Sequence, residues 1–65
     1  METNKEIELF SMNVKNCHEQ SKLQEMLWRQ DMLLWLTKDK ERKAIINIKK
    51  NIIKSRIIEV LESKL

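Results

Sequence analysis

Apolar residues in the first half of the chain recur three or four positions apart, which is the spacing of an amphipathic helix. At about 100° per residue these positions share one stripe, which an unbroken helix would carry along about 28 residues. The stripe comprises Ile7, Phe10, Val14, Cys17, Ser21, Trp28, Met32 and Trp35. This continuity predicts one long helix over about residues 4–36, about 50 Å in length at 1.5 Å per residue.

The stripe is weakest at residues 16–21, where polar side chains dominate. A break at this point is an alternative that the pattern leaves open. It would divide the predicted first helix into two shorter ones.

A second apolar face occurs in the later part of the predicted first helix. Leu23, Leu27 and Leu34 lie opposite the tryptophans, with Met26 and Leu33 between the two faces. A helix that is apolar on two sides is covered on two sides. One partner helix from the same chain cannot do this alone, so the pattern predicts an oligomer.

A polar segment, Thr37 to Glu41, separates this helix from a second apolar pattern and predicts a turn at about residues 37–40. Beyond it, seven-residue repeats and their neighbours predict a second helix over about residues 40–64. These apolar positions are Ile45, Ile46, Ile52, Ile53, Ile57, Val60 and Leu61. The β-branched residues could suggest strands, but their spacing does not have a period of two.

Together these patterns predict an all-α fold with a single domain over residues 1–65. Two long antiparallel helices would form a hairpin, and two hairpins would dimerise into a four-helix bundle or a higher helical oligomer. The side chains predicted to form the self-association or partner interface are Ile7, Phe10, Val14, Leu23, Leu27, Trp28, Met32, Leu34, Trp35, Ile46, Ile53, Ile57 and Val60. Trp28 and Trp35 fit either the bundle core, including its homo-oligomer seam, or a foreign partner's pocket.

The amino-acid composition of the chain argues against most kinds of catalytic and metal-binding site. The chain has no glycine and no proline, so β-hairpins and phosphate-binding loops are not expected. Cys17 and His18 are the only cysteine and histidine. They cannot form an intrachain disulfide or a closed zinc site, and adjacent helical residues point about 100° apart rather than forming a nucleophile–base pair. We therefore expect no enzyme activity, no metal and no cofactor.

Three features predict a cytoplasmic protein. The N-terminus is acidic and polar, unlike a signal peptide, and the longest apolar run, at residues 32–36, is too short to span a bilayer. A single cysteine suits a reducing compartment. The second helix carries no Trp or Phe on its apolar face, so binding to a membrane surface is not expected either.

Charge divides unevenly between the two predicted helices. Residues 1–37 carry four basic and six acidic side chains, whereas residues 38–65 carry nine basic and four acidic ones. The basic strip, a candidate surface for a polyanion or an acidic partner, comprises Lys38, Lys40, Arg42, Lys43, Lys49, Lys50, Lys54 and Arg56. Two interpretations remain: a surface that faces phosphate, or the solvated side of an amphipathic helix.

The sequence favours a helical protein that self-associates and binds another protein, as an inhibitor, adaptor or assembly subunit. Its small size and lack of a chemical site are typical of viral (phage) or mobile-element proteins that block a host protein complex. The alternative is a nucleic-acid-binding helical dimer that uses the basic strip at residues 38–56. A nucleic-acid binder should lose affinity steeply with salt and should fail when Lys49 and Lys50 are changed to glutamate.

Overall fold

The protein consists of three helices joined by two short connections. The structure, a computed structural model, describes the backbone of residues 2–64 and the side chains of residues 4–64. The helices are α1 (Glu2–Lys15), α2 (Gln20–Leu36) and α3 (Lys40–Ser63). The described residues contain no strand, which confirms the all-α prediction.

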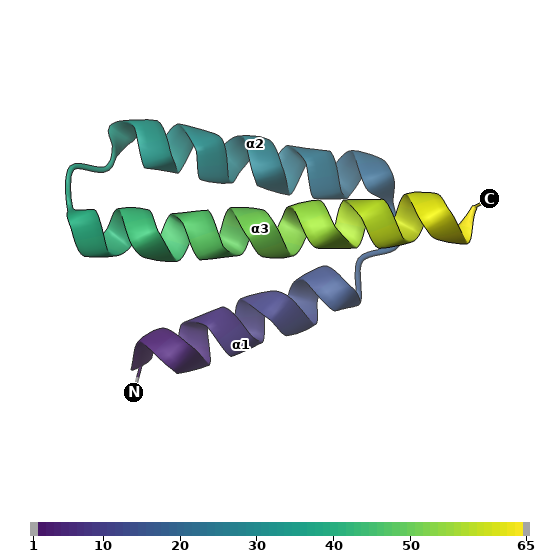
Figure 1. Cartoon of the computed structure of the whole chain (residues 1–65), viewed down its shortest axis with the longest axis horizontal. Coiled ribbons are helices and arrows are strands. Elements are labelled where there is room, and N and C mark those ends of the chain that lie inside the picture. The colour runs from purple at the N-terminus through teal and green to yellow at the C-terminus, as the bar shows by residue number, and fades with distance from the viewer. Residues whose placement is uncertain (1, 65) are drawn as a thin grey trace.

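The single helix predicted for residues 4–36 is two helices, α1 and α2. A non-helical linker at residues 16–19 separates them, within the polar segment where a break remained open. The chain is therefore a three-helix array, of which α2 and α3 form an antiparallel hairpin (Figure 1).

Local hydrogen bonding and a long-range contact together end α1. The Asn16 N–H still donates to the Met12 carbonyl at 3.1 Å, but the Cys17 N–H donates to the Val14 carbonyl, also at 3.1 Å. This tighter pattern is common at helix ends, where four carbonyls lose their helical partners. One of the linker carbonyls, that of Cys17, accepts a hydrogen bond from Arg56 of α3 at 3.2 Å. The linker is thus anchored to α3.

The turn between α2 and α3 occupies residues 37–39, where the polar segment predicted one. The Thr37 N–H donates to the Leu33 carbonyl at 2.9 Å and closes the last turn of α2. Asp39 is the N-cap of α3, and its carboxylate accepts from the Glu41 N–H at 3.0 Å. A capped start of this kind satisfies one amide that a helix leaves without a partner.

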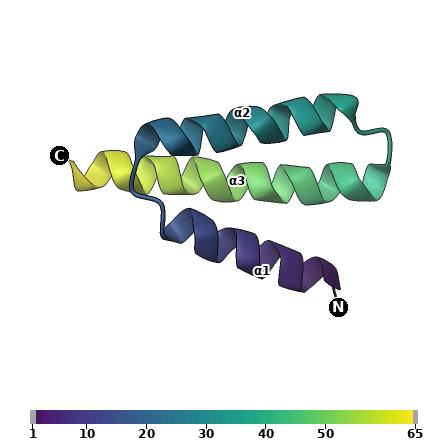
Figure 2. The same cartoon turned by 180° about the vertical axis from the view of Figure 1, so that it is seen from behind.

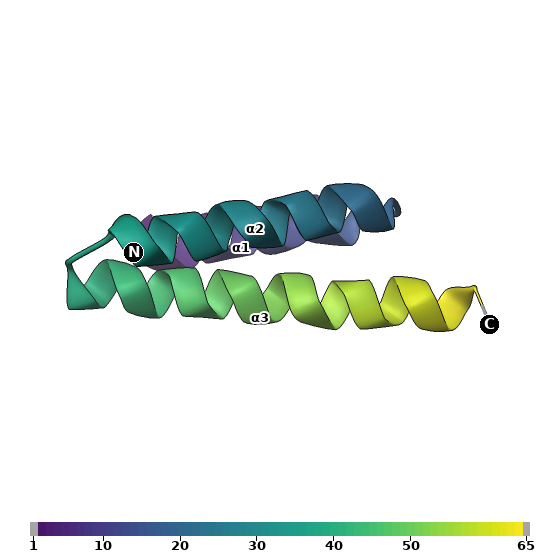
Figure 3. The same cartoon turned by 90° about the horizontal axis from the view of Figure 1, so that it is seen from above.

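The three helices form an open array with α3 in the middle. Both α1 and α2 pack against α3 but make few contacts with each other. Figures 1 and 2 show α1 and α2 on opposite sides of α3, and Figure 3 shows both displaced toward one face of it. The result is a flat molecule that measures 39 × 25 × 13 Å.

The core is small and lies where the helices converge beside the linker. Its buried side chains are Val14, Leu23, Ile53 and Val60. Two further side chains, Ile45 and Ile46, are buried outside this cluster, near the start of α3. Four of these six belong to α3, which agrees with its central position. The most enclosed are Val14, Leu23 and Ile53, one from each helix and each no more than 1% exposed. These three residues therefore fix how the helices meet.

The open arrangement leaves a large surface for so small a chain. The accessible surface is 5299 Å² for a mass of 7.9 kDa. A compact monomer of this mass is expected to expose about 4,400 Å², so the excess is about 900 Å². The three helices by themselves do not reach the burial of an ordinary small domain.

Candidate protein interface

The outer side of α2 presents four large apolar side chains to solvent. Trp35 is 88% exposed, Leu36 66%, Trp28 62% and Met32 44%. We call these four residues the tryptophan face. Together with Asp31 they line a shallow hollow of about 310 Å³. Contiguous exposed apolar surface that includes aromatic residues is typical of sites that bind another macromolecule.

The tryptophan face points outward because the opposite side of α2 packs on α3. Leu23 is fully buried, and Leu27 and Leu34 are half-buried on the same side. At about 100° per residue, Met32 lies about 180° from Leu23, and Trp28 and Trp35 lie within about 60° of Met32. Both faces of the helix are apolar, as the sequence indicated, and the hairpin covers only one of them.

The break at residues 16–19 changes where the tryptophans lie relative to the apolar residues of α1. In an unbroken helix the tryptophans would continue the line of Phe10 and Val14, which pack toward α3. The linker interrupts that register, so Trp28 and Trp35 point away from the core that Val14 enters. Because the linker changes the rotation of α2 about its axis relative to α1, the tryptophans lie on the surface and not in the core.

The residues predicted for an interface divide into three groups in the structure. Val14, Leu23, Ile46, Ile53 and Val60 are buried between the helices. Ile7, Phe10, Leu27, Leu34 and Ile57 are half-buried beside them. Trp28, Met32 and Trp35 are exposed together.

The sequence prediction missed two residues that matter for this division. Leu36 belongs to the exposed face, and its spacing of four from Met32 and eight from Trp28 was the available signal. Ile45 is buried although it was not selected for the interface. Leu9 and Met12, each 59% exposed, form a smaller apolar area on the outside of α1 that the pattern did not single out.

Half of the predicted basic strip is engaged within the fold. Arg42 and Lys49 pair with Glu6 at 3.5 and 3.3 Å, Lys50 pairs with Asp31, and Arg56 pairs with Glu59 at 3.2 Å. The side chains of Lys49, Lys50 and Arg56 are each less than 20% exposed. The remaining members, which make no ion pair among the described residues, are Lys38, Lys40, Lys43 and Lys54. The strip is therefore not one continuous solvated surface.

Glu6 is the acidic centre of the contact between α1 and α3. The hydrogen bond and the charge of Lys49, followed by the charge of Arg42, lower the pKa of Glu6 below its ordinary value of 4.5. The Lys49 ammonium also lies 5.2 Å from the centre of the Phe10 ring, within the range of a cation–π contact. These contacts hold the half of α1 that lies away from the linker against α3.

Arg56 makes the contacts that hold the linker end of α1 against α3. Besides its bond to the Cys17 carbonyl, it lies 3.0 Å from His18 Nδ1 and donates to Glu59 at 3.2 Å. Because a guanidinium only donates, this geometry requires His18 Nδ1 to accept. Cys17 and His18, the only cysteine and histidine in the chain, thus lie in the linker, where Arg56 of α3 contacts both of them.

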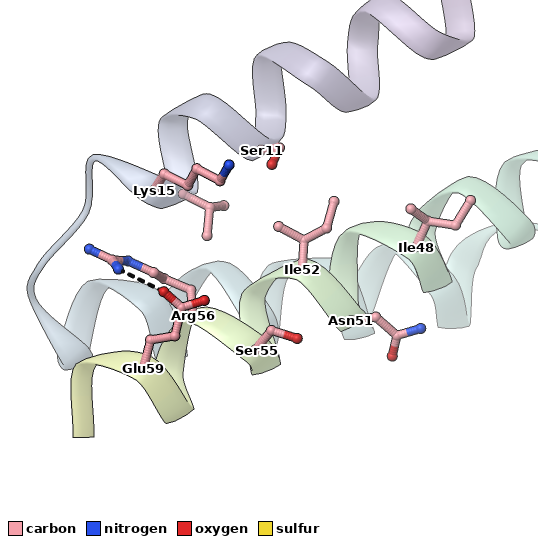
Figure 4. Close-up of a pocket in the computed structure, with 9 residues that line it drawn as sticks. Ser11, Lys15, Ile48, Asn51, Ile52, Ser55, Arg56 and Glu59 are labelled. Atoms are coloured by element: carbon pink, nitrogen blue, oxygen red, sulfur yellow. Dashed lines mark hydrogen bonds and ion pairs between the residues drawn. The ribbon is translucent and has the colours of Figure 1, made fainter. Parts of the chain in front are cut away.

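A groove of about 370 Å³ runs between α1 and α3, and it is shown in Figure 4. Ser11 and Lys15 from α1 and Ile52 from α3 border it, and the Arg56–Glu59 pair lies at the linker end. Its charged groups therefore include a pair already used in the fold. The groove is an open space between two diverging helices rather than a cleft around reactive groups.

The described part of the chain offers no assembled site for a metal ion. No three histidine, cysteine, aspartate or glutamate side chains gather there closely enough to share one. None of the described helices combines the length and the apolar character needed to cross a membrane. No family model, curated protein or solved structure was found to match this chain. The geometry of its own surface is accordingly the basis for assigning a function.

Proposed function

We propose that this protein acts by binding other protein surfaces, and that the tryptophan face of α2 is its contact surface. One observation carries the proposal: two tryptophans one heptad apart are 62% and 88% exposed beside Met32 and Leu36. Trp and Met are enriched in interface centres, and tryptophans are common among the residues that dominate binding energy. By covering the surface of a partner, the protein would act sterically, as an inhibitor, an adaptor or an assembly subunit.

The size of the face agrees with this role. A tryptophan side chain buries about 150–250 Å², so covering the exposed parts of Trp28 and Trp35 would remove about 300 Å² from water. At about 25 cal/mol per Å², this contributes about 8 kcal/mol before association costs. Those costs are about 4–15 kcal/mol, so the two tryptophans leave little or no surplus and tight binding also needs Met32 and Leu36. The whole face, rather than one anchor, is the functional unit.

The proposal retains three expectations from the sequence. Self-association into a helical bundle would cover apolar surface that the three-helix array leaves open. A small phage or mobile-element protein that blocks a host complex would need only such a surface. A reducing cytoplasm suits a chain whose single cysteine, Cys17, has no second cysteine to pair with.

Trp35→Glu provides the direct test, because Trp35 is the most exposed member of the face and makes the smallest contribution to the core. Leu9→Glu is the matched control, since Leu9 is 59% exposed on the outside of α1. Tagged wild-type and variant proteins would be compared by quantitative mass spectrometry after capture from the native host. Trp35→Glu should lose specific partners that Leu9→Glu keeps. Equal capture by both variants would contradict the proposal.

A nucleic-acid-binding role is the second candidate, and three exposed lysines favour it. Lys40, Lys43 and Lys54 fall on one side of α3 by helical spacing, and all are exposed. Lys49 and Lys50 are unsuitable for the test, because their change to glutamate would break ion pairs that hold the helices. The triple change of the exposed lysines to glutamate should abolish salt-dependent binding to duplex or structured RNA if this role is correct. Absence of such binding in the wild type would exclude it.

A further inference from the structure

We propose that the tryptophan face binds a second copy of this chain, with the two α2 helices antiparallel across a two-fold axis between residues 31 and 32. This inference rests on the proposed function, since it assigns an occupant to the same surface. It names the partner as a self-copy and gives the register of the contact. Three observations carry it: the surface area of the chain, the spacing of the tryptophans and the charges beside them.

The surface area corresponds to one side of a stable protein interface. The chain exposes 5299 Å², about 900 Å² more than a compact monomer of its mass. A standard interface buries about 800 Å² from each partner. The excess, summed over the whole chain, is therefore close to what one copy would contribute to a dimer. A second copy is also present wherever the first is made, so this face has a partner in every cell that makes the protein.

The spacing of the tryptophans is self-complementary in an antiparallel pair. Trp28 and Trp35 are seven residues apart, about 10.5 Å along the helix, and share one stripe. A two-fold axis midway between them places Trp28 beside the partner's Trp35 and Trp35 beside the partner's Trp28. Met32 then lies at the centre, next to the partner's Met32. Paired aromatic rings and a flexible thioether form a contact of the kind found in helix-bundle cores.

The charges beside the face fit the same register. Glu25, whose side chain is 61% exposed and pairs with Arg29 at 3.3 Å, would lie beside the partner's Lys38, an exposed residue in the turn that follows α2. Asp31 lies next to the axis, where two copies of one charge would approach each other. Lys50 of the same chain already pairs with Asp31 and neutralises it. The antiparallel arrangement therefore places opposite charges together and leaves no like pair uncompensated at the axis.

Cysteine cross-linking tests the face and its orientation. In a Cys17→Ser background, Met32→Cys should form a disulfide-linked dimer under mild oxidation. Met12→Cys, at a residue 59% exposed on α1, is the control: it keeps the tryptophan face and should dimerise, but it should form no disulfide-linked dimer. For orientation, Glu25→Cys and Lys38→Cys variants would be mixed. A cross-link between the two different variants is expected, whereas efficient cross-linking of Glu25→Cys with itself would indicate a parallel pair and overturn the register.

Sedimentation equilibrium separates a failure of this inference from a failure of the proposed function. The wild type should have about twice the mass of the 7.9 kDa chain, and Trp35→Glu should be monomeric. A wild type that stays monomeric at all concentrations, or Met12→Cys cross-linking as fast as Met32→Cys, would overturn the second-copy proposal. If Trp35→Glu nevertheless lost a captured partner, the protein-binding function would stand with a foreign occupant. If Trp35→Glu changed neither mass nor capture, both proposals would fail.

Discussion

Replacing Gln20 with proline tests the division between α1 and α2 directly. Gln20 is the first residue of α2, and Glu19 before it has φ −94° and ψ 118°. Proline is favoured at the first position of a helix, because no helical hydrogen bond needs its N–H. The residue before a proline prefers extended backbone close to the angles that Glu19 already has. The structure therefore accommodates proline at this position without rearrangement.

The change in the free energy of unfolding expected for Gln20→Pro distinguishes the three-helix array from an unbroken first helix. At a compatible position, proline stabilises a protein by about 0.4–1 kcal/mol, because it restricts the unfolded chain. Inside a continuous helix it would remove a hydrogen bond and clash with the preceding turn, at a cost of about 3 kcal/mol or more. The free energy of unfolding of Gln20→Pro should thus differ by about 3 to 4 kcal/mol between the two arrangements.

Urea denaturation followed by far-UV circular dichroism provides the assay. All variants should be measured at one protein concentration, because association contributes to apparent stability. Gln24→Pro is the matched control: Gln24 is exposed in the interior of α2, so this variant should lose about 3 kcal/mol. A loss of similar size for Gln20→Pro would refute the break at residues 16–19.

Three further predictions follow from the packing and the ion pairs. Ile53→Ala should lower the free energy of unfolding by about 2–5 kcal/mol, whereas Ile58→Ala, at a residue 56% exposed, should change it by less than about 0.5 kcal/mol in the same urea titrations. Asp39→Ala should cost about 1 kcal/mol by removing the cap of α3, measured as a shift in the urea midpoint. Glu6→Gln should destabilise the protein near neutral pH, because the pKa of Glu6 is lowered by Lys49. Since a lowered carboxylate pKa stabilises the fold above pH 4.5 and less as pH falls through the folded value, wild type and Glu6→Gln should converge in acid denaturation profiles. A difference that persists in acid would contradict this origin.

The second half of the fold could be predicted from the sequence because its signals are local. The isoleucines at helical spacing and the polar residues before them indicated α3 and the turn at residues 37–39. The break at residues 16–19 could not be decided in the same way. Besides local hydrogen bonds, it involves Arg56, which lies 39 positions beyond Cys17 and donates to the Cys17 carbonyl. No pattern within the first half of the chain contains that contact.

The candidate site was predictable in its residues but not in its orientation. Two apolar faces on α2 follow from periodicity alone, and Trp28, Met32 and Trp35 were selected by it. Which of the two faces packs against α3 depends on how α2 is rotated about its axis relative to α1. The conformation of the linker sets that rotation. The basic strip was overestimated for a related reason. Sequence position cannot show that Lys49 reaches Glu6 on α1.

The central claim is that a second molecule covers the tryptophan face, and the fluorescence of the protein itself tests it. Trp28 and Trp35 are the only tryptophans in the chain, so their emission reports on this face alone. In a dilution series run beside sedimentation equilibrium, the emission should move to longer wavelength as the mass falls toward 7.9 kDa. Emission typical of water-exposed tryptophan at every concentration, together with a constant monomer mass and no shift on adding any captured partner, would contradict the account.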